Sequence, residues 1–249
     1  MPLRRLMLDG PETELQATSN AQPAILFHSL ALLRLMAARG LAPALVAGHS
    51  MGEFAGLVAA EALDPFDALA AVQARGRAMS DAAPAASGMV AVLGLADNAV
   101  ELACAASAGE VVVANYNAPG QVVISGSEAG LKAIGPRLGA AGAKRQVRLP
   151  VSGAFHSPLM ANAAQVFNAD AQVHQDPIEV RRLMVGQLTG PVRWTQSIQQ
   201  LQQLGADTYI EVGPRKTLTG LVKKILPGAV VHNIEDLASM NTTLKTIHG

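Results

Sequence analysis

The sequence predicts an α/β protein with a large subdomain built on a parallel sheet and a small subdomain inserted into it. The chain has 249 residues, half of them hydrophobic, which is enough to bury a full core. Short apolar runs typical of buried strands alternate with helix-length segments. From about residue 88 to residue 150 the expected strands follow one another at shorter intervals along the sequence. We therefore expect one subdomain over residues 1–87 and 150–249, and another over residues 88–149.

The large subdomain begins with helices around one strand. Ser19 and Asn20 are expected to cap the first helix, and Gly40 to end it. The expected elements are a helix over 23–39, a buried strand over Leu45–His49 and helices over 53–62 and 65–81. After a loop over 151–158 we expect helices over 178–187 and 197–204, a strand over 208–212 and a helix over 218–225.

The middle of the chain shows the order strand, helix, strand, strand, helix, strand. These elements are expected over 89–93, 98–107, 111–116, 121–125, 128–141 and 145–149, with a turn over 117–120. The order βαββαβ is that of the ferredoxin-like plan, so we expect a ferredoxin-like small subdomain.

Composition excludes several classes of protein. No apolar run approaches the roughly 18 residues of a membrane span, and no signal-peptide core follows the amino terminus. The lone cysteine, Cys104, excludes an intramolecular disulfide and a metal cage built from cysteines. We expect a cytoplasmic protein that does not bind membranes.

Charge is balanced overall but unevenly distributed. Residues 1–129 hold 6 Lys and Arg against 12 Asp and Glu, whereas residues 130–230 hold 12 against 5. The basic excess is compatible with an acidic docking partner and equally with scattered solvated side chains. Basic runs with interleaved aromatics are absent from the sequence, so nucleic acid is not an expected partner.

The pentapeptide Gly48-His49-Ser50-Met51-Gly52 has the pattern G-x-S-x-G. It lies between the expected strand and helix, where the nucleophile elbow of an α/β-hydrolase-like fold belongs. Ser50 is then the candidate nucleophile. The backbone N–H of Met51, at the helix start, is a candidate oxyanion donor. The alternative is an ordinary glycine-rich turn between a strand and a helix.

A serine nucleophile needs a base, and histidine is the usual one. Spacing alone does not choose among the six histidines, which are His28, His49, His156, His174, His232 and His248.

Five blocks in a fixed order resemble a known family. They are residues 48–54 (GHSMGEF), 73–79 (QARGRAM), 114–126 (ANYNAPGQVVISG), 154–160 (AFHSPLM) and 211–214 (EVGP). Together they resemble the malonyl-CoA:acyl carrier protein transacylases of fatty-acid synthesis and the related acyltransferase domains of polyketide synthases. The resemblance covers nearly the whole chain.

The resemblance implies a role for each matching residue. Ser50 is expected to be acylated, and His156 to be its general base. Arg75, which by itself reads as a helix-surface arginine, is expected to bind the malonyl carboxylate with its two-pronged guanidinium. The main-chain carbonyl of Gln187 is expected to orient the histidine. Phe155 is expected to favour malonyl over methylmalonyl groups.

The expected activity is ping-pong transfer of a malonyl group from malonyl-CoA to the phosphopantetheine thiol of acyl carrier protein. The resemblance implies an enzyme with no metal or organic cofactor, and we expect a monomer.

Two alternatives stay open. One is a serine esterase or thioesterase that uses the same elbow, although no acid between Ser50 and His156 stands out as an orienting partner. The other is a catalytically silent module that binds carrier protein. This second alternative applies if the protein lacks the family's Gly-Gln-Gly-Ser-type loop, which supplies a second oxyanion donor. That loop would precede residue 1, and the stretch after Met160 is shorter than in the family.

Overall fold

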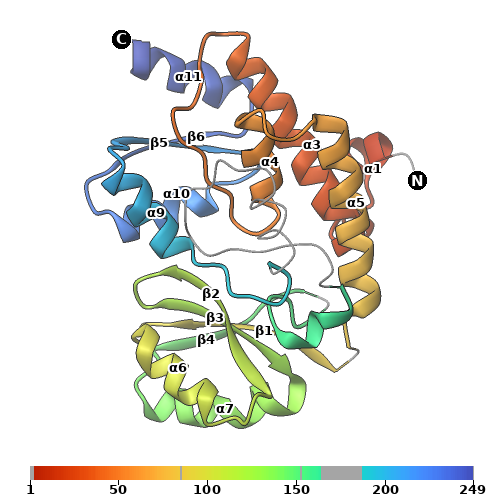
Figure 1. Ribbon diagram of the computed structural model, residues 1–249, viewed down its shortest axis with the longest axis vertical. Helices are drawn as coiled ribbons and strands as arrows, with labels where there is room; N and C mark the ends of the chain where they lie inside the picture. The colour runs from red at the N-terminus through yellow and green to blue at the C-terminus, as the bar shows by residue number, and fades with distance from the viewer. Residues whose placement is uncertain (1–2, 85, 152, 164–186, 249) are drawn as a thin grey trace. The chain divides into compact units, whose positions relative to one another are not determined.

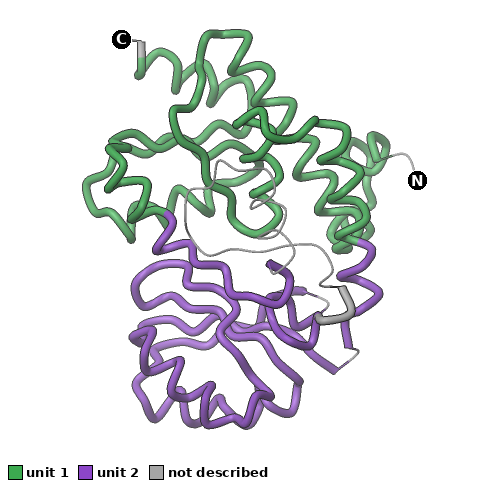
Figure 2. The backbone as a smooth tube through the Cα atoms, in the orientation of Figure 1, with its two compact units in different colours: residues 1–76, 198–249 green, residues 77–197 purple. Residues whose placement is uncertain are grey.

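A computed structural model of the protein describes residues 3–84, 86–151, 153–163 and 187–248. The expected α/β class is confirmed, because both helices and sheets are present. Contacts divide the chain into two compact units, shown in Figure 2. Unit 1 comprises residues 1–76 and 198–249, and unit 2 comprises residues 77–197.

Unit 2 is built on a four-stranded sheet in the spatial order β2-β3-β1-β4, and each neighbouring pair is antiparallel. The strands are β1 (Ser87–Leu93), β2 (Val111–Ala118), β3 (Gln121–Ser127) and β4 (Arg145–Arg148). Helix α6 (Asp97–Ala105) connects β1 to β2, and α7 (Glu128–Ala140) connects β3 to β4. The hydroxyl of Ser127 accepts a bond from Gly130 N and so caps α7.

Each face of this sheet has its own core. Helices α6 and α7 cover one face (Figure 1). Their apolar residues pack against alternating sheet residues, among them Val92, Val122 and Ile124. The opposite face carries Met89, Ala114 and Val123 and packs against Met79, Phe155, Met160 and Leu188.

One further segment extends the sheet at β2. Val192 N donates to Ala114 O and Tyr116 N donates to Val192 O, both at 2.8 Å. This forms a single parallel bridge between Asn115 and Val192. The segment that leads to Val192 is therefore anchored by backbone bonds.

Unit 1 contains a parallel pair, β5 (Thr208–Val212) and β6 (Val230–Ile234), joined by α10 (Thr217–Ile225). Its other helices are α1 (Leu3–Asp9), α2 (Glu12–Leu15), α3 (Thr18–Ala37), α4 (Gly52–Ala59) and α11 (Leu237–His248). Helices α5 (Pro65–Ala82) and α9 (Trp194–Gln203) each run from one unit into the other, and a 3-10 helix covers Pro158–Ala163. Leu32 and Met36 of α3 share a core with Ile234 and Met240.

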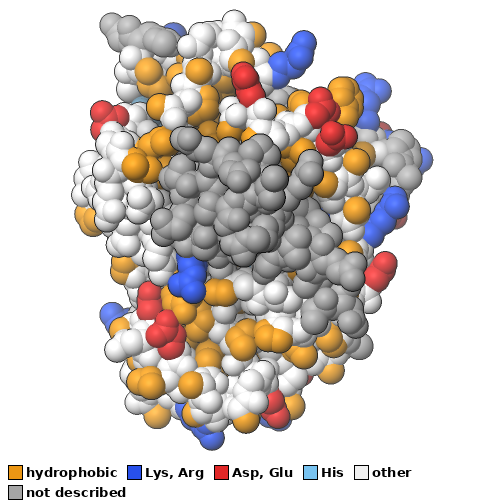
Figure 3. All heavy atoms as spheres, viewed as in Figure 1, with side chains coloured by type: hydrophobic (Ala, Val, Ile, Leu, Met, Phe, Trp, Pro, Cys, Tyr) orange, Lys and Arg blue, Asp and Glu red, His pale blue; other side chains and the backbone are white. Residues whose placement is uncertain are grey.

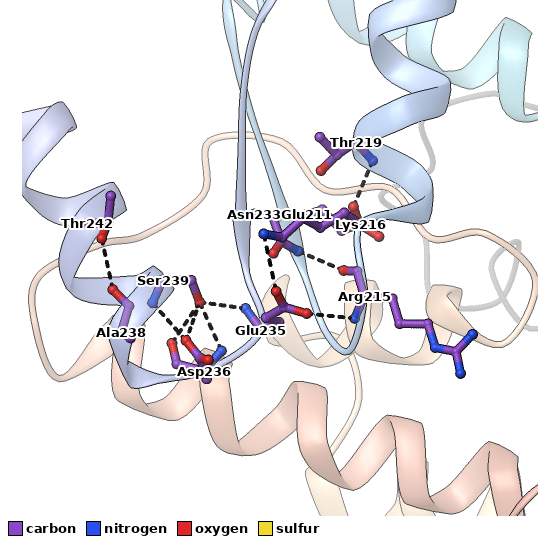
Figure 4. A network of polar contacts seen from close by, with 10 residues as sticks. All are labelled: Glu211, Arg215, Lys216, Thr219, Asn233, Glu235, Asp236, Ala238, Ser239 and Thr242. Carbon is purple, nitrogen blue, oxygen red and sulfur yellow. Dashed lines mark hydrogen bonds and ion pairs between the residues drawn. The ribbon is translucent and has the colours of Figure 1, made fainter.

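The carboxyl ends of β5 and β6 are held by the polar network in Figure 4. The Glu211 carboxylate accepts bonds from the N–H groups of Leu218 and Thr219, at 3.0 and 2.7 Å, and so caps α10. Glu235 accepts from Arg215 N, and Asn233 Nδ2 donates to Arg215 O. The sequence block 211–214 therefore leads into a tightly bonded turn.

The expected strand over Leu45–His49 is wrong in the described structure. These residues are irregular, and Val46 remains 36% exposed. A strand exists only where a neighbour accepts and donates its backbone bonds. None of the four described ranges contains a segment paired with this one.

Other elements differ more locally from expectation. Helix α3 begins at Thr18, so Ser19 and Asn20 lie inside it, and it ends at Ala37. Strand β6 and helices α1, α2 and α11 were not predicted. The helix expected over residues 178–187 falls almost wholly outside the described residues, as does His174, and Gln187 itself is in a turn. Within the described ranges, each helix is too short or too polar to span a bilayer.

Candidate active site

Ser50 lies in a strained turn immediately before α4. Its φ is +54°, a region that residues with a side chain rarely adopt. The turn is held by bonds from Gly52 N to His49 O at 3.0 Å and from Glu53 N to Ser50 O at 3.1 Å. Met51 is the N-cap of α4, so its N–H lies at the positive end of the helix dipole. A strained serine directly before a helix is one part of a nucleophile elbow; the strand that precedes the serine in such an elbow is not found in the described residues.

The two glycines of the pentapeptide differ in the space that a side chain would have at each position. A Cβ on Gly48 would lie 2.1 Å from Glu53 N and 2.2 Å from Gly52 C, distances that no real side chain tolerates. A Cβ on Gly52 would meet nothing within 4 Å. Gly48 is therefore required because the backbone folds back on the first turn of α4, whereas Gly52 is not required for packing.

Arg75 is a buried cation rather than a helix-surface arginine. Its side chain is 3% exposed on α5. Nη2 donates to Ser50 Oγ at 3.0 Å, and Nη1 donates to Gln22 Oε1 at 2.6 Å. Burial lowers the pKa of Arg75 to about 10, and the nearby charge of Glu53 opposes that shift. The guanidinium is thus charged at neutral pH and can bind a carboxylate.

A close helix contact places Arg75. Gly76 follows it on α5, and a Cβ there would lie 3.1 Å from both Ser19 Cα and Thr18 O. The absence of a side chain on Gly76 lets α5 approach the first turn of α3. That turn leads directly to Gln22, which no sequence motif singles out. A glutamine inside a helix carries no local signal of a role, so only the fold reveals it.

His156 lies in unit 2, is 4% exposed, and also has a positive φ, +55°. Its Nδ1 is 2.9 Å from the carbonyl oxygen of Gln187 and 3.3 Å from that of Gly190. Because carbonyl oxygens only accept, Nδ1 carries a proton, and in the neutral imidazole Nε2 is then the acceptor nitrogen. This tautomer is the one that a general base needs.

The remaining expected residues also lie in unit 2. Gln187 is buried, and its carbonyl contacts the histidine as described. The ring of Phe155 is buried in the core cluster with Met89 and Met160. Ser157 Oγ donates to Ala154 O at 2.5 Å and closes the loop around His156. The structure thus brings Ser50 and Arg75 together in unit 1, and Phe155, His156 and Gln187 together in unit 2.

Among the described residues, no group of three His, Cys, Asp or Glu side chains is placed to hold a metal ion.

Comparison with known proteins assigns the family. The family model described as acyl transferase domain matches residues 2–183. The malonyl CoA-acyl carrier protein transacylase of Escherichia coli K12 is 37% identical over 262 residues, which cover 96% of this chain and 85% of that protein. The chain belongs to the malonyl CoA-acyl carrier protein transacylase family. The matched region contains both Ser50 and His156.

Solved structures of this transacylase family have the same fold. An acyl carrier protein S-malonyltransferase from Vibrio cholerae has a TM-score of 0.92 and 37% identity, covering 97% of this chain and 86% of that one. A type II polyketide synthase malonyl-transacylase, solved in complex with its acyl-carrier protein, has a TM-score of 0.94 and 36% identity, covering 98% and 86%. The architecture seen here is therefore that of the transacylases.

The two glycines provide a test of the elbow geometry. Gly48→Ala should lower the free energy of unfolding by about 2 kcal/mol or more, because the added methyl overlaps backbone atoms that cannot rotate away. Gly52→Ala is the matched control and should leave stability unchanged or raise it by up to about 1 kcal/mol, because alanine favours the helix. Urea unfolding followed by circular dichroism measures both. Equal stability of the two variants would contradict the close approach at Gly48.

Proposed function

We propose that this chain transfers a malonyl group from malonyl-CoA to the phosphopantetheine thiol of acyl carrier protein through an ester on Ser50. The family is that of transferases with this activity. The observation that carries the proposal is the pairing of an elbow serine with a buried guanidinium 3.0 Å from its oxygen. A nucleophile beside a cation suits an acyl group that ends in a carboxylate.

The proposed first half-reaction forms the acyl-enzyme. His156 Nε2 takes the Ser50 proton as Oγ attacks the thioester carbonyl, and the Met51 N–H stabilises the oxyanion. The carbon–sulfur bond then breaks, and the coenzyme A sulfur leaves with the proton that His156 returns. The carbonyl of Gln187 holds the Nδ1 proton throughout, which supports this role for His156.

The second half-reaction repeats these steps with a different thiol. His156 takes the proton of the phosphopantetheine thiol, whose sulfur attacks the ester carbonyl on Ser50. The ester bond breaks, and Ser50 Oγ recovers its proton from the histidine. The malonyl group leaves as a thioester of the carrier protein.

Selectivity for the acyl group is proposed to depend on two residues. Arg75 binds the free carboxylate of the malonyl group as a charged fork. Phe155 leaves little room for an α-methyl group and so favours malonyl over methylmalonyl. Its burial supports this proposal, because a tightly packed ring does not readily swing aside. Excluding one methyl contributes only about 1–3 kcal/mol.

We also propose the domain plan and setting of the enzyme. Residues 88–149 form a ferredoxin-like subdomain, which the order β2-β3-β1-β4 supports. They are inserted into an α/β-hydrolase-like catalytic subdomain formed by residues 1–87 and 150–249. The enzyme serves fatty-acid or polyketide synthesis as a cytoplasmic monomer. It needs no resident cofactor, because serine supplies the covalent chemistry.

The first test concerns the nucleophile. Protein mixed with malonyl-CoA should gain the mass of one malonyl group, and Ser50→Ala should abolish that gain while leaving the fold intact. Cys104→Ala is the control and should keep the adduct, because the thiol is buried and its pKa is raised to about 11 by desolvation. An adduct on Ser50→Ala protein would exclude Ser50. An adduct lost to water as fast as to added thiol would indicate an esterase.

The second test concerns the carboxylate. Arg75→Ala should reduce malonyl loading about a hundredfold by removing charge-assisted bonds. Acetyl loading should be unchanged or higher, since a neutral acyl group gains nothing from the guanidinium. Arg75→Lys should restore only part of malonyl loading, because a point charge lacks the planar fork. The ratio of the two acyl-enzymes measures this effect. Equal losses for both acyl groups would make Arg75 a structural residue.

The third test concerns the carrier protein. Residues 130–230 carry an excess of Lys and Arg over Asp and Glu. Electrostatic steering of a carrier protein depends on the summed electric field of these charges rather than on one contiguous patch. On the face in Figure 3, Lys and Arg side chains stand singly among uncharged and acidic ones. Transfer to carrier protein should slow as salt rises, because charges are screened over about 10 Å at 0.1 M. Loading from malonyl-CoA should respond less. A transfer rate that is flat with salt would contradict electrostatic docking.

A further inference from the structure

Gln22 is linked to the nucleophile through Arg75. Its Oε1 accepts a bond from Arg75 Nη1 at 2.6 Å, and Arg75 Nη2 donates to Ser50 Oγ at 3.0 Å. The three residues come from α3, the elbow before α4, and α5, and all belong to unit 1. The hydrogen-bonded series Gln22–Arg75–Ser50 therefore lies within one compact unit.

The two bonds fix the plane of the guanidinium. The group is planar, so an acceptor on each terminal nitrogen determines how it is turned. The side chain is also 3% exposed, which leaves little room for other rotamers. Without the contact to Gln22, Nη1 would lose an acceptor that helps to orient the fork.

The chemistry of an amide suits this position. The Oε1 of Gln22 accepts a bond yet carries no net charge, so it holds Arg75 without neutralising it. A carboxylate at residue 22 would form an ion pair with the guanidinium and would compete with the carboxylate of a substrate. A neutral acceptor keeps the positive charge available.

We infer that Gln22 is a positioning residue that keeps the Arg75 guanidinium turned toward Ser50 for capture of a substrate carboxylate. This inference rests on the proposed function. Ser50 Oγ occupies a donor position on Nη2 that a malonyl carboxylate takes when it arrives, while Gln22 retains one N–H of Nη1 and leaves other donors of the fork for the second carboxylate oxygen. The exchange also releases a lone pair of the serine oxygen. A neutral acetyl group cannot drive this exchange. The arrangement therefore favours carboxylated acyl groups in two ways, because it binds their carboxylate and because that binding frees the serine oxygen.

A double-mutant cycle tests whether Gln22 acts through Arg75. The variants are Gln22→Met, which keeps the length of the side chain but removes the acceptor, Arg75→Ala, and the two combined. Gln16→Met is the matched control, because Gln16 is exposed and its side chain bonds only Glu12 among the described contacts. For each protein, KM and kcat are measured for loading from malonyl-CoA and from acetyl-CoA.

Gln22→Met should raise KM for malonyl-CoA about tenfold, the effect of one bond to a charged group, with little change in kcat. Acetyl loading should stay within about twofold, and Gln22→Met should have no further effect in Arg75→Ala protein. Gln16→Met should match wild type. Parallel losses for both acyl groups, or the same loss with and without Arg75, would assign Gln22 a structural role and overturn the inference. Wild-type protein that takes up no malonyl group would overturn the proposed function, and this inference with it.

Discussion

The buried charge of Arg75 is the constraint on which the arrangement of unit 1 depends. A guanidinium that is 3% exposed loses most of its hydration, and this loss lowers its pKa. Gln22 and Ser50 accept hydrogen bonds from the guanidinium, and Glu53 supplies a nearby negative charge. Gln22 comes from α3, whereas Ser50 and Glu53 come from the elbow and the first turn of α4. The contact at Gly76, the first turn of α3 and the elbow must therefore be correct together for the guanidinium to keep both of these hydrogen bonds.

Backbone strain marks the two residues expected to exchange a proton. Five residues other than glycine have a positive φ in the described ranges, and Ser50 and His156 are among them. Such conformations cost about 1–3 kcal/mol each and persist where surrounding bonds hold them. For Ser50 those bonds come from the first turn of α4. For His156 they come from the carbonyl groups of Gln187 and Gly190, on a segment that Val192 anchors to β2.

The sequence predicted elements best where the decisive interactions are local. The strands and helices between 87 and 148 were predicted within a few residues, because alternation, turn residues and caps lie within each segment. Leu45–His49 has the composition of a strand, but pairing depends on a partner elsewhere. Strand β6 was missed because His232 and Asn233 interrupt its apolar run.

The candidate site shows the same limit. The elbow pattern pointed to Ser50 directly, because its spacing is local. Spacing could not choose His156 among six histidines, and only the family resemblance indicated it. Arg75 by itself resembled a surface residue, and Gln22 gave no signal. Their importance comes from burial and from contacts between helices far apart in the sequence.

The short bridge at Val192 also bears on edge-to-edge association of the sheet in unit 2 with other copies of the protein. An open sheet exposes unpaired N–H and C=O groups along both outer strands, which can template aggregation during synthesis and refolding. At β2 the Val192 segment satisfies part of that row. The opposite outer strand, β4, has the sequence Arg-Gln-Val-Arg, whose charged and polar side chains disfavour pairing with the edge of another sheet. Among the described residues, the two outer strands thus differ: β2 carries a backbone bridge, and β4 carries charged side chains.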